Sequence, residues 1–176
     1  MIDYILEFEL SILGFLQNLR FDFLDSFFVF ITHLGDKGAL WIILGFTLCF
    51  MPKYKRAGIC VLLALLISFV ICNLTLKPII SRIRPYEYIE DIKLLIGKPK
   101  DFSFPSGHSS SSFCAAFSVW LKNKKIGTVC IIIAGLIAFS RLYLHVHFPS
   151  DVLAGIAIGI LSAISAKLII EKSQFS

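Results

Sequence analysis

Residues 57–76 read AGICVLLALLISFVICNLTL, which is twenty consecutive positions without a charged side chain. A helix of about 20 apolar residues is long enough to cross the hydrocarbon core of a bilayer. Within that core the backbone must satisfy its own hydrogen bonds, which a helix does along its whole length. The stretch therefore predicts an all-α integral membrane protein.

The composition of the whole chain agrees with this class. The sequence has 176 residues, of which 57% are hydrophobic and 16% charged, and it carries a net charge of +5. That length predicts a single domain, residues 1–176, and that hydrophobic fraction is too high for an ordinary soluble domain. Basic charge alone would also suit nucleic acid. No basic stretch interleaved with aromatic residues is present, so we expect the bilayer as partner, with no nucleic acid and no obligatory protein partner.

Further apolar runs lie on both sides of this stretch, at residues 22–34, 39–51, 109–121, 126–144 and 152–170. Together they predict a six-helix membrane bundle, preceded by a short amphipathic helix at residues 3–19 that lies in the interface. The two runs before residue 52 are short, so a re-entrant or interfacial pair is an alternative. Residues 3–34 could equally be one span, an interfacial helix plus a span, or a re-entrant segment.

Small residues in the last two runs predict close helix packing. They are Ala134, Gly135, Ala138, Ala154, Gly155, Ala157 and Gly159.

Basic residues between the runs predict the orientation in the membrane. Short loops rich in Lys and Arg stay on the cytoplasmic side, and three such groups share one side of a six-span bundle. The loops at 35–38, 77–105 and 145–150 then lie outside the cytoplasm. The 77–105 loop is itself basic, which weakens this rule unless catalysis retains some of its charges. We expect a multi-pass protein of the cytoplasmic membrane whose site faces the extracytoplasmic side. The three groups are Lys53, Lys55 and Arg56; Lys122, Lys124 and Lys125; and Lys167 with Lys172.

Three cations are predicted to converge on that outer face. Lys77, Arg84 and Arg141 each lie at or beyond the end of an apolar run. Arginine offers a planar fork that matches phosphate oxygens, and lysine adds a mobile point charge. Ser106 and Gly107 precede the run at 109–121, where free N–H groups at a helix start favour anions. The arrangement predicts a phosphate site without a Walker motif or an acidic metal cage.

Two histidines complete this site. His147 lies four residues before Asp151, so a helical turn would let the carboxylate bind one imidazole nitrogen and leave the other free as a nucleophile. His108 comes from a different run and can protonate the leaving oxygen. The residues thus predict phosphoryl transfer through a phosphohistidine, which water then hydrolyses.

These clusters resemble the signature of the type 2 phosphatidic acid phosphatase superfamily, K-x6-RP, PSGH and SR-x5-H-x3-D, whose fold is shared with the vanadium haloperoxidases. The resemblance implies a phosphatase without metal or cofactor, with His147 as nucleophile, His108 as acid and Asp151 as the partner of His147. It also implies a set of phosphate-binding residues, which are Lys77, Arg84, Ser106, Gly107 and Arg141. The matching positions are Lys77, Arg84, Pro85, Pro105, Ser106, Gly107, His108, Ser140, Arg141, His147 and Asp151.

The substrate expected from this resemblance is a lipid phosphate or diphosphate. Small bacterial members hydrolyse undecaprenyl diphosphate, phosphatidylglycerophosphate or lipid A phosphate, and we rank undecaprenyl diphosphate first because the site is expected to face away from the cytoplasm. Phosphatidic acid is a further alternative. Outside enzymes, a membrane transporter or a lipid-binding protein would also place charged residues in a bundle.

Other polar residues are interpreted as structural. We expect His33 to be a core residue, Arg82 to lie at the rim of the site, and Asp36 and Lys37 to be loop charges. His145 matches no signature position and is assigned a structural or rim role. The five cysteines all lie in apolar runs without a Cys-x-x-Cys pair, which indicates neither a zinc site nor a redox motif.

Overall fold

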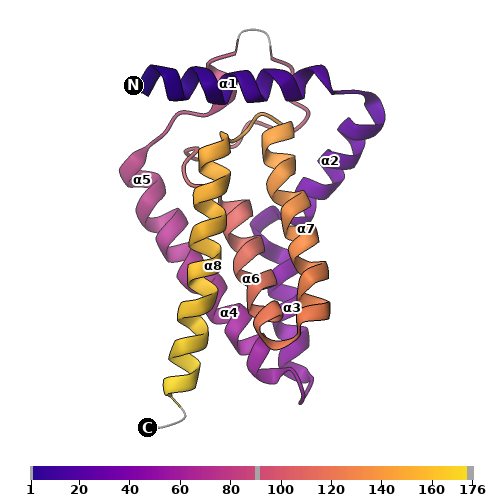
Figure 1. Ribbon diagram of the computed structural model, residues 1–176, viewed down its shortest axis with the longest axis vertical. Coiled ribbons are helices and arrows are strands. Elements are labelled where there is room, and N and C mark those ends of the chain that lie inside the picture. Colours follow the sequence, from indigo (N-terminus) through magenta and orange to yellow (C-terminus); the bar gives the residue numbers. More distant parts are fainter. Residues whose placement is uncertain (1, 90–91, 174–176) are drawn as a thin grey trace.

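The computed structural model describes residues 2–89 and 92–173, and these residues form helices joined by turns, as predicted (Figure 1). The ends of the predicted domain, residue 1 and residues 174–176, lie outside the described residues. The α-helices are α1 (Ile2–Asn18), α2 (Asp22–Leu34), α3 (Ala39–Phe50), α4 (Lys55–Phe69), α5 (Lys77–Ile80), α6 (Gly107–Lys122), α7 (Lys124–Tyr143) and α8 (Pro149–Lys172). Shorter helical turns are η1 (Asp36–Gly38), η2 (Val70–Leu76) and η3 (Pro85–Glu87).

Helix α6 lies at the centre of the bundle, packed against α4, α7 and α8. Close approach of α8 depends on two glycines. A Cβ atom at Gly155 would lie 2.5 Å from the carbonyl oxygen of Ser106, and one at Gly159 would lie 2.5 Å from that of Ser110. The predicted close packing is confirmed at these two positions. It is wrong at Gly135, where no atom lies within 4 Å of an added Cβ, because that part of α7 has no neighbour on the glycine's side.

Fewer helices meet the criteria for a membrane span than the six that we expected. Within residues 2–89 and 92–173, three do by length and composition, at Lys55–Glu87, Lys124–Tyr143 and Pro149–Lys172. Helix α2 and the segment from η1 through α3 meet them only as a pair, bent by 41°. Helix α6, with 16 residues, is too short to meet the criteria, and it is rich in serine. Several of its serines are buried, because the surrounding helices cover them.

The predicted span ends at residue 76, but the helical structure continues beyond it. After α4 the helix changes to the π form in η2 and then continues as α5. A π segment widens the turn, which alters the direction of the side chains it carries and is common at functional sites. In this chain Asn73 of η2 lines the cavity described below, and Lys77 at the start of α5 is buried.

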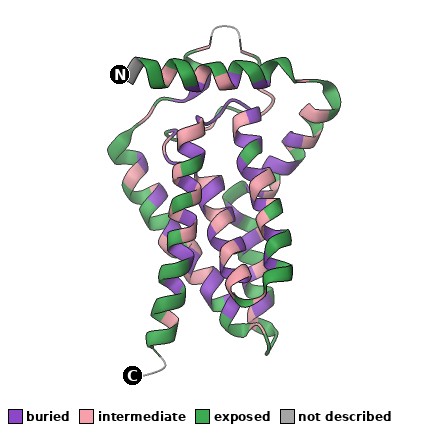
Figure 2. Cartoon of the chain, viewed as in Figure 1, coloured by how far each residue is buried: buried purple, intermediate pink, exposed green. Residues whose placement is uncertain are grey.

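Helix α1 lies across one end of the bundle, nearly perpendicular to the other helices (Figure 1). Large apolar side chains such as Phe8 and Phe15 are exposed on its outer face, beside polar residues such as Glu7, whereas Glu9 and Leu13 are buried against the protein (Figure 2). The helix predicted near residues 3–19 is therefore present. The Glu9 carboxylate faces the bundle.

The two glycine environments give a direct test of the packing. We expect Gly159→Ala to destabilise the protein by about 1–3 kcal/mol, because the added methyl group meets backbone atoms that cannot move independently. Gly135→Ala is the matched control and should be neutral or slightly stabilising, since the space beside it is open. Thermal unfolding of the detergent-purified variants measures both. Equal melting temperatures would contradict the packing described for α6 and α8.

Candidate active site

His147 lies in the turn between α7 and α8 and is almost completely buried. Its Nε2 is 3.3 Å from Nη1 of Arg84, and its Nδ1 is 3.5 Å from Oδ2 of Asp151. Asp151 lies in the first turn of α8, which begins at Pro149, a residue favoured at the first helical position. The structure thus places Asp151 beside one imidazole nitrogen and leaves the other facing the cations, as the spacing predicts.

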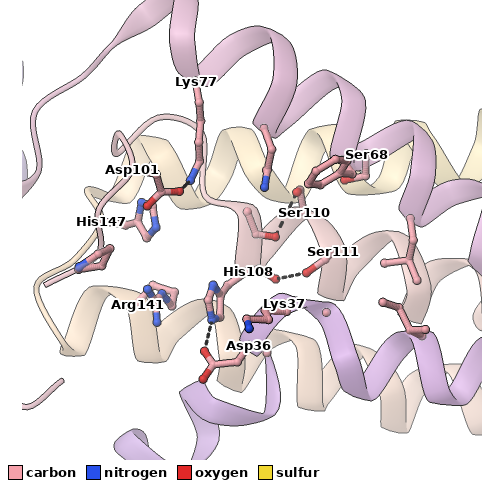
Figure 3. A pocket seen from close by; sticks show the side chains of 18 of the residues that line it. Asp36, Lys37, Ser68, Lys77, Asp101, His108, Ser110, Ser111, Arg141 and His147 are labelled. Atoms are coloured by element: carbon pink, nitrogen blue, oxygen red, sulfur yellow. Dashed lines mark hydrogen bonds and ion pairs between the residues drawn. The ribbon is translucent and has the colours of Figure 1, made fainter. Parts of the chain in front are cut away.

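Three buried cations line the cavity that Nε2 of His147 faces. Lys77 lies at the start of α5 and Arg141 in the last turn of α7, and both side chains point into the same cavity (Figure 3). Arg84, which follows α5, also lines this cavity. Arg141 donates to the hydroxyl of Thr32, while its Nε has no partner among the described residues. Burial lowers the pKa of His147 well below its usual value, and the positive charges nearby lower it further. The imidazole is therefore neutral, as a nucleophile requires.

Asp101 lies between two of these cations, which we did not expect from the sequence. Its Oδ1 accepts a hydrogen bond from Nη2 of Arg84 at 2.7 Å, and its Oδ2 forms an ion pair with Lys77. Burial alone would raise the pKa of Asp101, but the hydrogen bonds and charges of Lys77 and Arg84 outweigh it and lower the pKa to about 2. A carboxylate thus occupies part of the space that phosphate oxygens would need. The only sequence signal was an acidic residue in a mostly basic loop.

The start of α6 contributes Gly107 and His108 to the cavity. Ser106 does not line it, because the serine is fully buried and caps the helix, accepting from the N–H of Ser109 at 3.4 Å and from its hydroxyl at 2.9 Å. Phosphate binding by Ser106 remains a prediction.

His108, the predicted acid, contacts Asp36, which we expected to be only a loop charge. Its Nε2 lies 3.1 Å from Oδ1 of Asp36, whose Oδ2 is 2.8 Å from Nδ1 of His33. His33 is exposed rather than a core residue, because it lies at the end of α2 beside the cavity. The preceding Gly35 permits this contact, since a Cβ there would lie 2.6 Å from the His108 ring.

The cavity has a volume of about 780 Å³ and two chemically different ends. One end holds His147 and the cations. The other runs between α3 and α4 and is lined by apolar side chains. Lys37 lies between the two ends, beyond His108 as seen from His147 (Figure 3). The apolar residues are Ile42, Leu62, Leu65, Leu66 and Phe69.

His145 does not reach this cavity. Its two ring nitrogens contact the carbonyl oxygens of Tyr143 and Leu13, both at 3.0 Å, and so connect the turn after α7 to α1. This supports the structural role among the two expected.

Asp101 should compete with an anion for the cations. Because its pKa is lowered to about 2, its carboxylate remains charged at every pH well above that value. We expect Asp101→Asn to bind inorganic phosphate roughly tenfold more tightly than the wild type near neutral pH. Isothermal titration calorimetry measures this, with Glu87→Gln in the same loop as control. Weaker binding by Asp101→Asn would mean that the carboxylate organises the cations for phosphate instead of excluding it.

Comparison with known proteins places this arrangement among lipid phosphatases. An undecaprenyl-diphosphatase of Sulfolobus acidocaldarius is 28% identical over 169 residues, which cover 88% of this chain and 81% of the relative. The crystal structure of Aquifex aeolicus LpxE has a TM-score of 0.77 and 32% identity, and the match covers 89% of this chain and 93% of that one. A transmembrane phosphatidylglycerolphosphate phosphatase from Bacillus subtilis has a TM-score of 0.77 and 30% identity, covering 94% and 86%.

A family model extends the match to the catalytic clusters. The model of the PAP2 superfamily covers residues 57–175, which is well over half of the chain and includes every signature position. With this match, the structural likeness and the relatives above, the chain belongs to the PAP2 superfamily and is a hydrolase of phosphate esters.

Proposed function

We propose that the protein hydrolyses a lipid phosphate or diphosphate through a phosphohistidine on His147. The observation that carries this proposal is the neutral, buried imidazole whose Nε2 faces Arg84 at the cationic end of the cavity. A nucleophile needs a lone pair, which neutral Nε2 has and which a phosphate bound to Arg84 would release, and the transferred phosphoryl group needs neutralisation of its oxygens. Both requirements are met within one cavity.

The reaction proceeds in two steps. Nε2 of His147 attacks phosphorus, the bond from phosphorus to the leaving oxygen breaks, and that oxygen takes a proton from His108. Asp151 stabilises the positive imidazole that results. A water molecule then gives its proton to His108 and attacks phosphorus, which breaks the nitrogen–phosphorus bond and releases phosphate. Lys77, Arg84 and Arg141 neutralise the equatorial oxygens in both steps.

The apolar end of the cavity supports a lipid as substrate. Side chains from α3 and α4 line it, and this apolar end shares one cavity with His147 and the cations, with Lys37, Ser110 and Ser111 also in the lining. A hydrocarbon chain bound there would bury apolar surface at about 25 cal/mol per Å².

Lys37 favours a diphosphate over a monophosphate. It lies on the leaving-group side of His108, where the second phosphate of a diphosphate would be held (Figure 3). Its backbone has a φ of 53°, which is uncommon for a residue with a side chain. Among the residues that the structure describes, its ammonium group has no hydrogen-bond or ion-pair partner, whereas the neighbouring Asp36 is shared by two histidines. On this basis undecaprenyl diphosphate ranks first.

We further propose six membrane crossings in the cytoplasmic membrane, with α6 crossing inside a shell formed by its neighbours and α1 lying in the interface. The active site then faces the extracytoplasmic side. The exposed apolar side chains of α1 support its interfacial position. The basic loops at the opposite end of the bundle support the orientation.

A lipid panel tests the enzyme directly. Detergent-purified protein in EDTA should release phosphate from undecaprenyl diphosphate faster than from phosphatidylglycerophosphate, phosphatidic acid or lipid A phosphate. His147→Ala should lose activity by roughly 10⁴-fold or more, because no other group replaces the nucleophile. No release from any lipid by folded wild-type protein would contradict the proposal, and a protein that transports ions or only binds lipid would give that result.

The role of Lys37 predicts a change in selectivity. We expect Lys37→Gln to raise the KM for undecaprenyl diphosphate roughly tenfold, because one contact to the second phosphate is lost, while the KM for phosphatidic acid stays near that of the wild type. Lys98→Gln is the control, since it removes an exposed charge from the same face of the molecule. An equal rise in KM for both substrates would mean that Lys37 contributes only general electrostatic attraction and does not bind the second phosphate.

A further inference from the structure

A second group of charged residues lies behind His147, outside the cavity. Glu9 of α1 is buried, with an exposed fraction of 4%. Its Oε2 accepts a hydrogen bond from Nη2 of Arg82 at 2.5 Å, and its Oε1 accepts from the backbone N–H of Ser150 at 2.8 Å. Both carboxylate oxygens of Glu9 are therefore engaged, one by Arg82 and the other by the first turn of α8.

Arg82 extends this contact to the catalytic carboxylate. Its Nη1 donates to Oδ1 of Asp151 at 2.6 Å and to the hydroxyl of Ser150 at 2.7 Å. Its guanidinium carbon lies 3.9 Å from the centre of the Phe148 ring, which holds the group in one plane. A continuous chain of charges thus runs from α1 through Arg82 to Asp151.

The other oxygen of Asp151 is fixed from its remaining sides. Oδ2 accepts from the N–H of Phe148 at 2.9 Å and from the hydroxyl of Ser103, and it lies 3.5 Å from Nδ1 of His147. With Oδ1 committed to Arg82, the carboxylate has a single orientation. That orientation determines which oxygen His147 meets.

The balance of charge also suits the reaction. Two buried carboxylates share one guanidinium, so the group keeps a net negative charge next to His147. Buried charges are expensive unless they are paired, and removing one partner leaves the other uncompensated. The imidazole becomes positive when it is phosphorylated, and the remaining negative charge stabilises that state.

We infer that Arg82 and Glu9 are positioning residues for the reaction at His147, with Arg82 acting through Asp151 and Glu9 acting through Arg82. Helix α1 is then part of the catalytic apparatus and not only a surface attachment. The sequence interpretation had placed Arg82 at the rim of the site and Glu9 on an interfacial helix. This inference rests on the proposed function at His147.

A double-mutant cycle tests the part played by Arg82. Arg82→Gln should lower kcat roughly 10- to 100-fold with KM near that of the wild type, which is the usual effect of losing a group that orients a catalytic residue. In an Asp151→Asn background the same change should lower kcat by less than about twofold, because Arg82 acts through that carboxylate. Arg82→Lys should recover part of the loss. An equal fall in kcat in both backgrounds would overturn the inference, because loss of a merely structural residue would lower kcat whether or not Asp151 is present.

Glu9→Gln tests the part played by α1, and its near-identical shape guards against misfolding. The amide still accepts from Ser150 but loses the charge, so we expect kcat to fall by about 3- to 10-fold with KM unchanged. Glu7→Gln, on the exposed face of the same helix, is the matched control and should match the wild type. If the two variants behave alike, α1 has no catalytic part. Activity of the wild-type enzyme tests the proposed function separately, so the two failures are distinguishable.

Discussion

Burial of positive charge at one end of an apolar bundle is the constraint on which the rest of the structure depends. Lys77, Arg84 and Arg141 are each about 5% exposed, with values of 6%, 4% and 4%. Such cations require anionic or hydrogen-bonding partners, because an unpaired buried charge is strongly destabilising. Asp101 supplies part of that compensation in this structure. Under the proposed function a phosphate would replace it, so the site would exchange one anion for another.

The same constraint explains the groups of acidic residues around the cavity. Asp36 contacts His108, the proposed acid, and Asp151 lies 3.5 Å from Nδ1 of His147, the proposed nucleophile. Each of these two histidines thus has a carboxylate beside one ring nitrogen. Glu9 and Arg82 support Asp151 from α1, which links the outermost helix to the chemistry.

Much of the candidate site was predictable from the sequence because the spacing of His147 and Asp151 is local. His147 and Asp151 are one helical turn apart, so their meeting needs only a helix start at Pro149. The contacts that we missed, Asp101 with Lys77 and Arg84 and Asp36 with His108, form only through the tertiary fold. No periodicity or spacing links either aspartate to a residue so distant in the chain.

The prediction of the helices from hydropathy was limited in a similar way. Apolar runs gave the positions of α4, α7 and α8, because lipid-facing side chains must be apolar whatever the tertiary structure. The run at α6 is interrupted by serines that neighbouring helices bury, and the run at α2 and α3 is divided by a bend of 41°. The hydropathy of a segment indicates whether it can contact lipid, but not whether neighbouring helices keep its polar side chains away from lipid.

The central claim is that phosphate is transferred to His147. The most direct measurement is to mix the enzyme with substrate for less than one turnover, quench in alkali, which preserves phosphohistidine, and locate the phosphate by mass spectrometry of the peptides. We predict a phosphate on His147, which is absent in His147→Ala. Phosphate release at the wild-type rate without a modified His147, or with phosphate on another residue, would contradict it.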